Sequence, residues 1–122
     1  MHIVNLISII KNGLMRRKAY VESLNNKKIR SFLRLLVQEG YIQGFKSIKK
    51  NRHLIIYLKY FKNEHTIKIL KIISKPSIRR YITVKELTKL NRTVIVSTSL
   101  GLMMGAEAIR LNKGGELLAH IN

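Results

Sequence analysis

One short segment near the end of the chain constrains the fold most strongly, because a β-branched run, a hydroxyl cluster and a glycine follow one another in it. The segment reads Val94-Ile95-Val96-Ser97-Thr98-Ser99-Leu100-Gly101-Leu102-Met103. Its first three residues predict a short buried strand, since β-branched side chains are stiff and pack well on a pleated surface. Ser97, Thr98 and Ser99 then place small hydroxyls at the strand's end, and Gly101 permits a sharp turn or close approach by another molecule.

A loop of this kind suits contact with nucleic acid. Hydroxyls and backbone amides donate and accept hydrogen bonds with little bulk, so they fit phosphate, ribose or base edges. The alternative is a strand-end turn whose hydroxyls only satisfy their own backbone. The charge favours contact: 24 Lys and Arg stand against 6 acidic residues, all Glu, for a net charge of +18. Such a field destabilises an isolated fold and is relieved by a polyanion, of which nucleic acid is the first candidate.

Composition argues against several other classes of protein. The chain has no cysteine, and its four histidines are scattered without metal-ligand spacing, so we expect no metal site. It has no Asp, no nucleophile elbow and no phosphate-binding glycine loop, so we expect no enzyme, no cofactor and no small-molecule substrate. No apolar run approaches the ~18 residues of a membrane span. Residues 1–14 are interpreted as a helix and not as a signal peptide.

The first half of the chain alternates helical and strand-like patterns. Apolar residues at helical spacing predict helices over 3–14 and 29–40, the second capped by Asn25 or Asn26 and ended by Gly40. Lys28 and Arg34 lie on the basic side of the second helix, where they are candidates for phosphate contact or members of a solvated face. Strands are predicted at 19–23, 42–48 and 54–60, the last two forming a hairpin with a basic tip.

The second half is predicted to be mostly strand. Period alone leaves residues 66–73 open between strand and helix, and their β-branched content favours strand. Pro76 is the only proline and marks the best lobe boundary. We then expect a strand over 77–84, a turn or short helix over 85–91, one or two helical turns over 105–111 and a last strand over 116–121.

Two further residues are candidates for the same site. Tyr81, on a half-exposed strand, is either a core aromatic whose hydroxyl reaches solvent or a ring that stacks on a base or sugar. Glu116 is unusual in so basic a chain. Its carboxylate either accepts hydrogen bonds from base amino groups or backbone amides, or forms a surface ion pair with Arg110 or Lys113.

At these residues the chain resembles a known family, the bacterial-type small-subunit ribosomal protein eight. The core of the match is Ile95 to Met103, followed after four spacer residues by Ala108 and then by Gly114-Gly115-Glu116. Upstream, Ser74-Lys75-Pro76-Ser77-Ile78-Arg79-Arg80-Tyr81 is similar to the family's Ser-Arg-Pro-Gly-x-Arg-x-Tyr segment. Ile10 to Gly13 and Leu36 to Ile42 extend the resemblance over nearly the whole chain.

The resemblance implies an α+β protein of two small lobes. The first, residues 1–74, would place two helices on a three-stranded sheet, and the second, residues 75–122, would be mostly β with a short helix and would bind rRNA. It implies a structural constituent of the small ribosomal subunit that binds a central-domain rRNA stem, supports assembly and adjoins other small-subunit proteins. The implied RNA contacts are Ser97, Thr98, Ser99 and Gly101 in the loop, Tyr81 and Glu116 beside it, and Lys75 and Arg79 on phosphates.

The departures from the family pattern indicate a divergent member, and they leave open a different rRNA stem or different neighbouring proteins. The run before the Val94 strand is about three residues shorter, Ser77 replaces a glycine, and an acid usual near Val4 is absent. Together with residue types that have A/T-rich codons, these changes favour a divergent mitochondrial member, with a plastid or bacterial cytoplasm as alternatives. A generic DNA- or RNA-binding module that reads with the helix at 29–40 is the competing function, and a membrane-surface protein ranks last.

Overall fold

The computed structural model describes residues 3–74 and 77–122. The chain divides into two compact units, Met1–Lys68 and Ile69–Asn122. The predicted boundary after residue 74 falls six residues later than this division. The difference arises at Leu70 and Ile72, which pair with Ile121 and Ala119 of the last strand and so tie this segment to the second unit.

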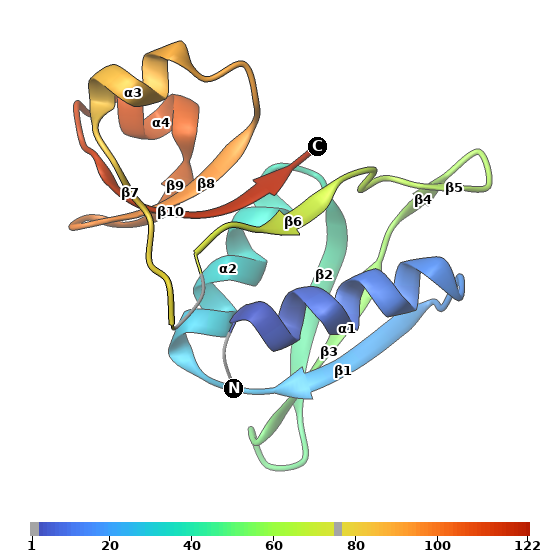
Figure 1. The fold of residues 1–122 in the computed structure, drawn as a ribbon. Coiled ribbons are helices and arrows are strands. Elements are labelled where there is room, and N and C mark those ends of the chain that lie inside the picture. Colours follow the sequence, from blue (N-terminus) through green and yellow to red (C-terminus); the bar gives the residue numbers. More distant parts are fainter. Residues whose placement is uncertain (1–2, 75–76) are drawn as a thin grey trace. The chain divides into compact units, whose positions relative to one another are not determined.

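The first unit places two helices on one face of an antiparallel three-stranded sheet (Figure 1). The sheet has the order β1-β3-β2, and a two-stranded hairpin, β4–β5, follows it. Every second residue of β1 and β3 is buried, and the residues between them are exposed in β1 and half-buried in β3, so one face of the sheet is the more closely packed. The elements in chain order are α1 (Ile3–Met15), β1 (Tyr20–Leu24), α2 (Lys27–Gln38), β2 (Ile42–Ile48), β3 (His53–Leu58), β4 (Tyr60–Phe61) and β5 (Glu64–His65).

Helix α2 forms where its apolar stripe and its end signals agree. The side chain of Asn26 caps the helix by accepting a hydrogen bond from the Ile29 amide at 2.8 Å, which satisfies one of the free amides of the first turn. The stripe on Ile29, Phe32, Leu33 and Leu36 is fully buried. Gly40, at φ +78°, takes the left-handed conformation that ends many helices.

The second unit is a five-stranded antiparallel sheet with two short helices. Four strands follow the order β6-β10-β8-β9, and β7 pairs with β10 as well. One face of the sheet carries a core of Val96, Met103 and Leu117, which packs with Leu87 and Ala108 from the helices. The elements are β6 (Leu70–Ile72), β7 (Tyr81–Ile82), α3 (Val84–Lys89), β8 (Val94–Thr98), β9 (Gly101–Met104), α4 (Gly105–Arg110) and β10 (Gly115–Ile121).

The predicted α+β class, with two helices on a three-stranded sheet followed by a mostly β part, is confirmed. Several predicted strands are wrong in extent. Of residues 66–73 only β6 is strand, and of residues 77–84 only β7 is strand. The second of these ends early because Thr83 and Glu86 form a capping box, in which each side chain accepts from the other residue's backbone amide, and Val84 therefore begins a helix.

Strand β9 was not predicted. Residues 101–104 contain no β-branched side chain, so local propensity does not indicate a strand there. They form one because the whole segment pairs with β8, from Thr98 opposite Gly101 to Ile95 opposite Met104. Across the part of the chain that the structure describes, no helix is long and apolar enough to cross a membrane.

Candidate nucleic-acid interface

Three of the predicted site residues form one row across the sheet of the second unit. Glu116 on β10 pairs with Tyr81 on β7 on one side and with Ser97 on β8 on the other. Residues directly opposite each other in antiparallel strands share a face, so an aromatic ring, a carboxylate and a hydroxyl lie next to one another. Tyr81 is 71% exposed. The row is therefore a surface feature and not part of the core.

The opposite face of the same strands holds the row in place. The neighbouring residues Ile82, Leu117 and Val96 are buried in the core of the second unit. Because side chains alternate between faces, burying these residues forces the polar row outward. Slipping β10 by one residue would bury Glu116 and expose Leu117, so the core fixes the register of the site.

The hydroxyl cluster lies at the tip of the β8–β9 hairpin. The Thr98 hydroxyl accepts from the Leu100 amide at 3.1 Å and donates to the Gly101 carbonyl at 3.0 Å, so it braces the turn. Gly101, at φ +118°, adopts a conformation that side chains disfavour. The Ser99 side chain is exposed and makes no hydrogen bond with the residues that the structure describes. At the tip, the Thr98 hydroxyl is therefore bonded to the backbone, and the Ser99 hydroxyl is accessible to a ligand.

Glu116 pairs with Arg79, a partner that the sequence did not indicate. The Arg79 guanidinium donates to both carboxylate oxygens, at 3.2 and 3.3 Å. The Arg79 side chain is 49% exposed, whereas that of Glu116 is only 15% exposed. The Glu116 carboxylate is thus mostly buried, whereas the Arg79 guanidinium is half-exposed. This arrangement can present guanidinium N–H groups to an anion while the carboxylate fixes their orientation.

The sequence also allowed an ion pair of Glu116 with Arg110 or Lys113. For Arg110 this alternative is wrong. Arg110 donates to both oxygens of Glu107, one turn away on α4. These hydrogen bonds hold the pKa of the Glu107 carboxyl below its usual value and raise the pKa of Arg110. Arg79 reaches Glu116 instead because β7, which follows Arg79, pairs directly with β10.

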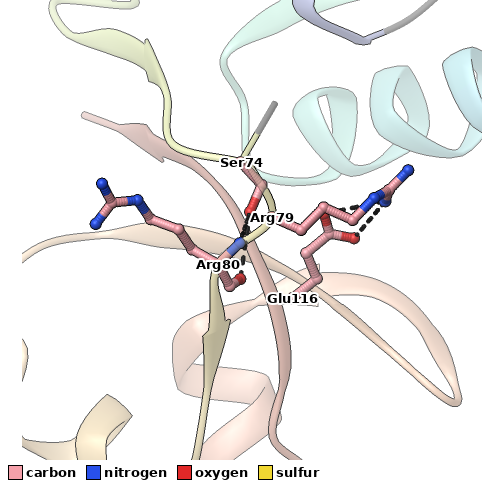
Figure 2. A network of polar contacts seen from close by, with 4 residues as sticks. All are labelled: Ser74, Arg79, Arg80 and Glu116. Carbon is pink, nitrogen blue, oxygen red and sulfur yellow. Dashed lines mark hydrogen bonds and ion pairs between the residues drawn. The ribbon is translucent and has the colours of Figure 1, made fainter. Parts of the chain in front are cut away.

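Ser74 is a positioning residue that the sequence analysis missed. Its hydroxyl accepts from the Arg80 amide at 2.9 Å and donates to the Arg80 carbonyl at 3.2 Å, and the residue is only 5% exposed. These two bonds tie together the ends of the loop that carries Arg79. Figure 2 shows Arg79 directed at Glu116, with the Arg80 side chain pointing the other way. The predicted contact Lys75 lies outside the described residues.

Two glycines let β10 approach its neighbours closely. A Cβ on Gly115 would lie 2.1 Å from the Ser97 carbonyl oxygen, and one on Gly114 would lie 2.6 Å from the Ile82 carbonyl oxygen. Both neighbours are backbone atoms, which cannot move aside as a flexible side chain can. The pair Gly114-Gly115 therefore admits β10 between β7 and β8, and this brings Glu116 into the row.

The remaining predicted contacts lie in the first unit. Lys28 and Arg34 are exposed on α2. Within the described residues, no group of three or more His, Cys, Asp or Glu side chains could hold a metal ion. The second unit therefore offers hydrogen-bonding groups, an aromatic ring for stacking and the half-exposed guanidinium of Arg79.

Fold and site together define a strongly basic α+β protein with an in-register row of polar side chains across the sheet of its second unit. A sequence model of the family described as ribosomal protein S8 matches residues 2–122. "Small ribosomal subunit protein uS8" of Malacoplasma penetrans is 38% identical over 98% of this chain and 95% of its own length. The proteins of that name from Afipia carboxidovorans and Mycoplasmopsis synoviae are 38% and 37% identical, over 95% and 98% of this chain and 92% and 95% of their own lengths.

The chain belongs to the ribosomal protein S8 family. The resemblance identified from the sequence is thereby confirmed over nearly the full length. Proteins of this family are structural and not enzymes, which agrees with the absence of a triad or phosphate loop from the sequence.

Proposed function

We propose that this chain is a structural constituent of a small ribosomal subunit that binds a central-domain stem of small-subunit rRNA and supports subunit assembly. Family membership supports the ribosomal role, and the net charge of +18 supports a polyanionic partner. Neighbouring small-subunit proteins would be its other partners.

One observation carries the proposed RNA contact: the row of Tyr81, Glu116 and Ser97, which opens beside the hydroxyl tip of the β8–β9 hairpin. Double-stranded RNA is recognised across its wide, shallow minor groove, mostly through 2′-hydroxyl and phosphate contacts. A narrow hairpin tip with Ser99 exposed fits such a groove. In the proposal Arg79 lies on a phosphate, held by Glu116, and Tyr81 stacks on a base or sugar.

The roles of the other predicted contacts follow from their places in the structure. Thr98 and Gly101 shape the tip, since the Thr98 hydroxyl is bonded to its own turn. Lys28 and Arg34, exposed on α2, add sequence-independent phosphate attraction. Lys75 remains a proposed phosphate contact on the basis of the family resemblance.

The proposed compartment is the mitochondrion, with a plastid or bacterial cytoplasm as alternatives. Ile, Lys, Asn, Tyr and Phe make up 50 of the 122 residues, and their codons are A/T-rich, as in many organellar genomes. The relatives named above are bacterial, so they support the family and not the organelle. Sedimentation of the protein with small subunits from isolated mitochondria would test the compartment, and its recovery only with plastid or cytoplasmic ribosomes would refute it.

A salt titration of binding tests the RNA function. The full chain is titrated with a central-domain stem of the small-subunit rRNA and with a scrambled stem of equal length. The logarithm of the affinity due to phosphate contacts falls linearly with the logarithm of the salt concentration for both RNAs. The affinity due to direct contacts with groove edges depends little on salt. We expect the cognate stem to keep its advantage as salt rises. If both affinities fall together, the generic nucleic-acid module replaces the proposed function.

A further inference from the structure

The free face of the first unit's sheet carries side chains that no helix of that unit covers. The residues that face the helices are buried: Val21 and Ser23 on β1, and Leu54, Ile56 and Leu58 on β3. The residues between them form three in-register rows on the other face, each running from β1 through β3 to β2. The rows are Tyr20–Tyr57–Gly44, Glu22–Ile55–Lys46 and Leu24–His53–Ile48.

The first row is an aromatic shelf of two tilted rings with an open end. The rings of Tyr20 and Tyr57 lie 6.4 Å apart between centroids, at an interplanar angle of 60°. Tyr20 is 55% exposed. On the far side of Tyr57 the row ends at Gly44, where an added Cβ would meet nothing within 4 Å. The space beside the Tyr57 ring is therefore empty of side chain, which leaves room for a planar group.

The charges around this shelf favour an anionic partner. The face carries one acid, Glu22, and it is already engaged, since Lys49 donates to its carboxylate at 2.7 Å and His53 lies 3.0 Å from the same oxygen. The hydrogen bond from Lys49 also holds the pKa of Glu22 below its usual value. Lys46 is exposed on the same face, two residues along β2 from Gly44. Its ammonium makes no ion pair with the residues that the structure describes.

We propose that this face binds unpaired nucleotides of a single-stranded RNA segment, with Tyr20 and Tyr57 as the stacking platform and Lys46 on the backbone phosphate. Bases splayed out of a helix stack on aromatic side chains, and the strength of such stacking depends little on sequence. A protein partner would have to place acidic side chains opposite this positive face. RNA carries both planar bases and negative phosphates. This site lies in the other unit from the β8–β9 hairpin and does not depend on stem binding.

The test measures the affinity of the full chain for an eight-nucleotide oligoadenylate, in parallel with the central-domain stem. Tyr57→Ala removes one stacking surface, so we expect oligoadenylate binding to weaken about 5- to 150-fold. Tyr57→Phe keeps the ring and is the matched control, expected to bind within about twofold of the parent chain because stacking needs no hydroxyl. Equal losses in the two variants would overturn the stacking role.

Gly44→Val gives a second variant that keeps the core intact. Valine suits a strand, and the space at this position is open, so the variant should fold. Its side chain would fill the shelf beside Tyr57, and we expect oligoadenylate binding to fall while stem binding stays unchanged. A folded Gly44→Val chain that binds oligoadenylate as the parent does would overturn the proposal. Failure of the stem-binding function would show instead as equal affinity for cognate and scrambled stems.

Lys46→Ala tests the phosphate contact separately. Losing one phosphate contact should reduce the slope of log affinity against log salt by about 0.7 on a single strand. The matched control is Lys11→Ala on α1, which removes the same charge from the sequence but lies outside the three rows. An equal change of slope in both variants would mean that the charge acts only through the overall field, and the contact would be wrong.

Discussion

At the scale of single residues, the hairpin tip separates two hydroxyls that the sequence presents as equivalent. Thr98 is bonded to its own turn, and Ser99 is exposed. Periodicity and composition could not distinguish them, because the difference depends on which backbone groups the turn brings within reach. Ser97 differs again, since it lies in the row with Glu116.

Thr98→Val should therefore reduce mainly the stability of the protein, and Ser99→Ala mainly its affinity for the cognate stem. Thr98→Val removes two turn hydrogen bonds and should lower the free energy of unfolding by about 1–3 kcal/mol, given ~0.5–1.5 kcal/mol for each bond. Ser99→Ala should leave stability within ~0.5 kcal/mol, as for most surface substitutions, and weaken cognate-stem binding alone. Denaturant unfolding and stem titrations of both variants measure this. A loss of stability in Ser99→Ala would contradict the assignment.

Glu116→Gln distinguishes a bracing role from simple charge neutralisation. The variant removes a negative charge and should raise affinity for the scrambled stem, because overall attraction to phosphate increases. If the carboxylate orients Arg79 or accepts from a base, affinity for the cognate stem should fall at the same time. The ratio of the two affinities is the measurement. A rise on both RNAs by the same factor would show that Glu116 only lowers the charge.

At the scale of elements, the strands of the second unit depend on close backbone approach more than on propensity. The Gly114-Gly115 pair has no side chains beyond Cα, and this allows the close entry of β10 between β7 and β8. Likewise, β9 has weak strand propensity and forms through its pairing with β8. The Thr83–Glu86 capping box is the opposite case, a local signal present in the sequence that outweighed the β-branched residues around it.

Gly115→Ala should destabilise the second unit. The new Cβ would lie 2.1 Å from the Ser97 carbonyl, so β8 and β10 must separate, at a cost of about 1–3 kcal/mol by comparison with overpacked cores. Gly44→Ala is the matched control: its Cβ meets no atom, and it should be neutral or stabilise by up to about 1 kcal/mol. Thermal unfolding of both variants checks the prediction, and equal melting temperatures would refute it.

Asn26→Ala tests the helix that the sequence predicted best. The side chain accepts from the Ile29 amide, and losing such a cap costs about 1 kcal/mol. We expect lower stability of the chain with no change in the ratio of cognate to scrambled stem affinity. Asn12→Ala, an exposed substitution within α1, is the control and should have little effect. A changed affinity ratio for Asn26→Ala would place α2 at the specific RNA contact.

At the scale of the whole molecule, the net charge of +18 sets the response to salt. Repulsion among the cations opposes the compact state and is screened as ionic strength rises. We expect the melting temperature of the free protein to increase between about 10 mM and 150 mM salt, over which the Debye length falls from ~30 to ~8 Å. Binding to the stem should weaken over the same range. A melting temperature that is flat or falls with salt would contradict the self-repulsion argument.

The order of residues along the chain indicated a mixture of helices and strands, the limits of α2 to within two residues, the existence of the Val94 strand and its hydroxyl end, and the basic character of the surface. These follow from local periodicity, end signals and composition, which act over a few residues. The folded arrangement was needed to show that Tyr81, Glu116 and Ser97 share a row, that Arg79 is the partner of Glu116, and that Tyr20, Tyr57 and Gly44 form a shelf with an open end. Strand order and register join residues tens of positions apart, and they are fixed by which apolar faces can be buried together, a property that no single segment carries.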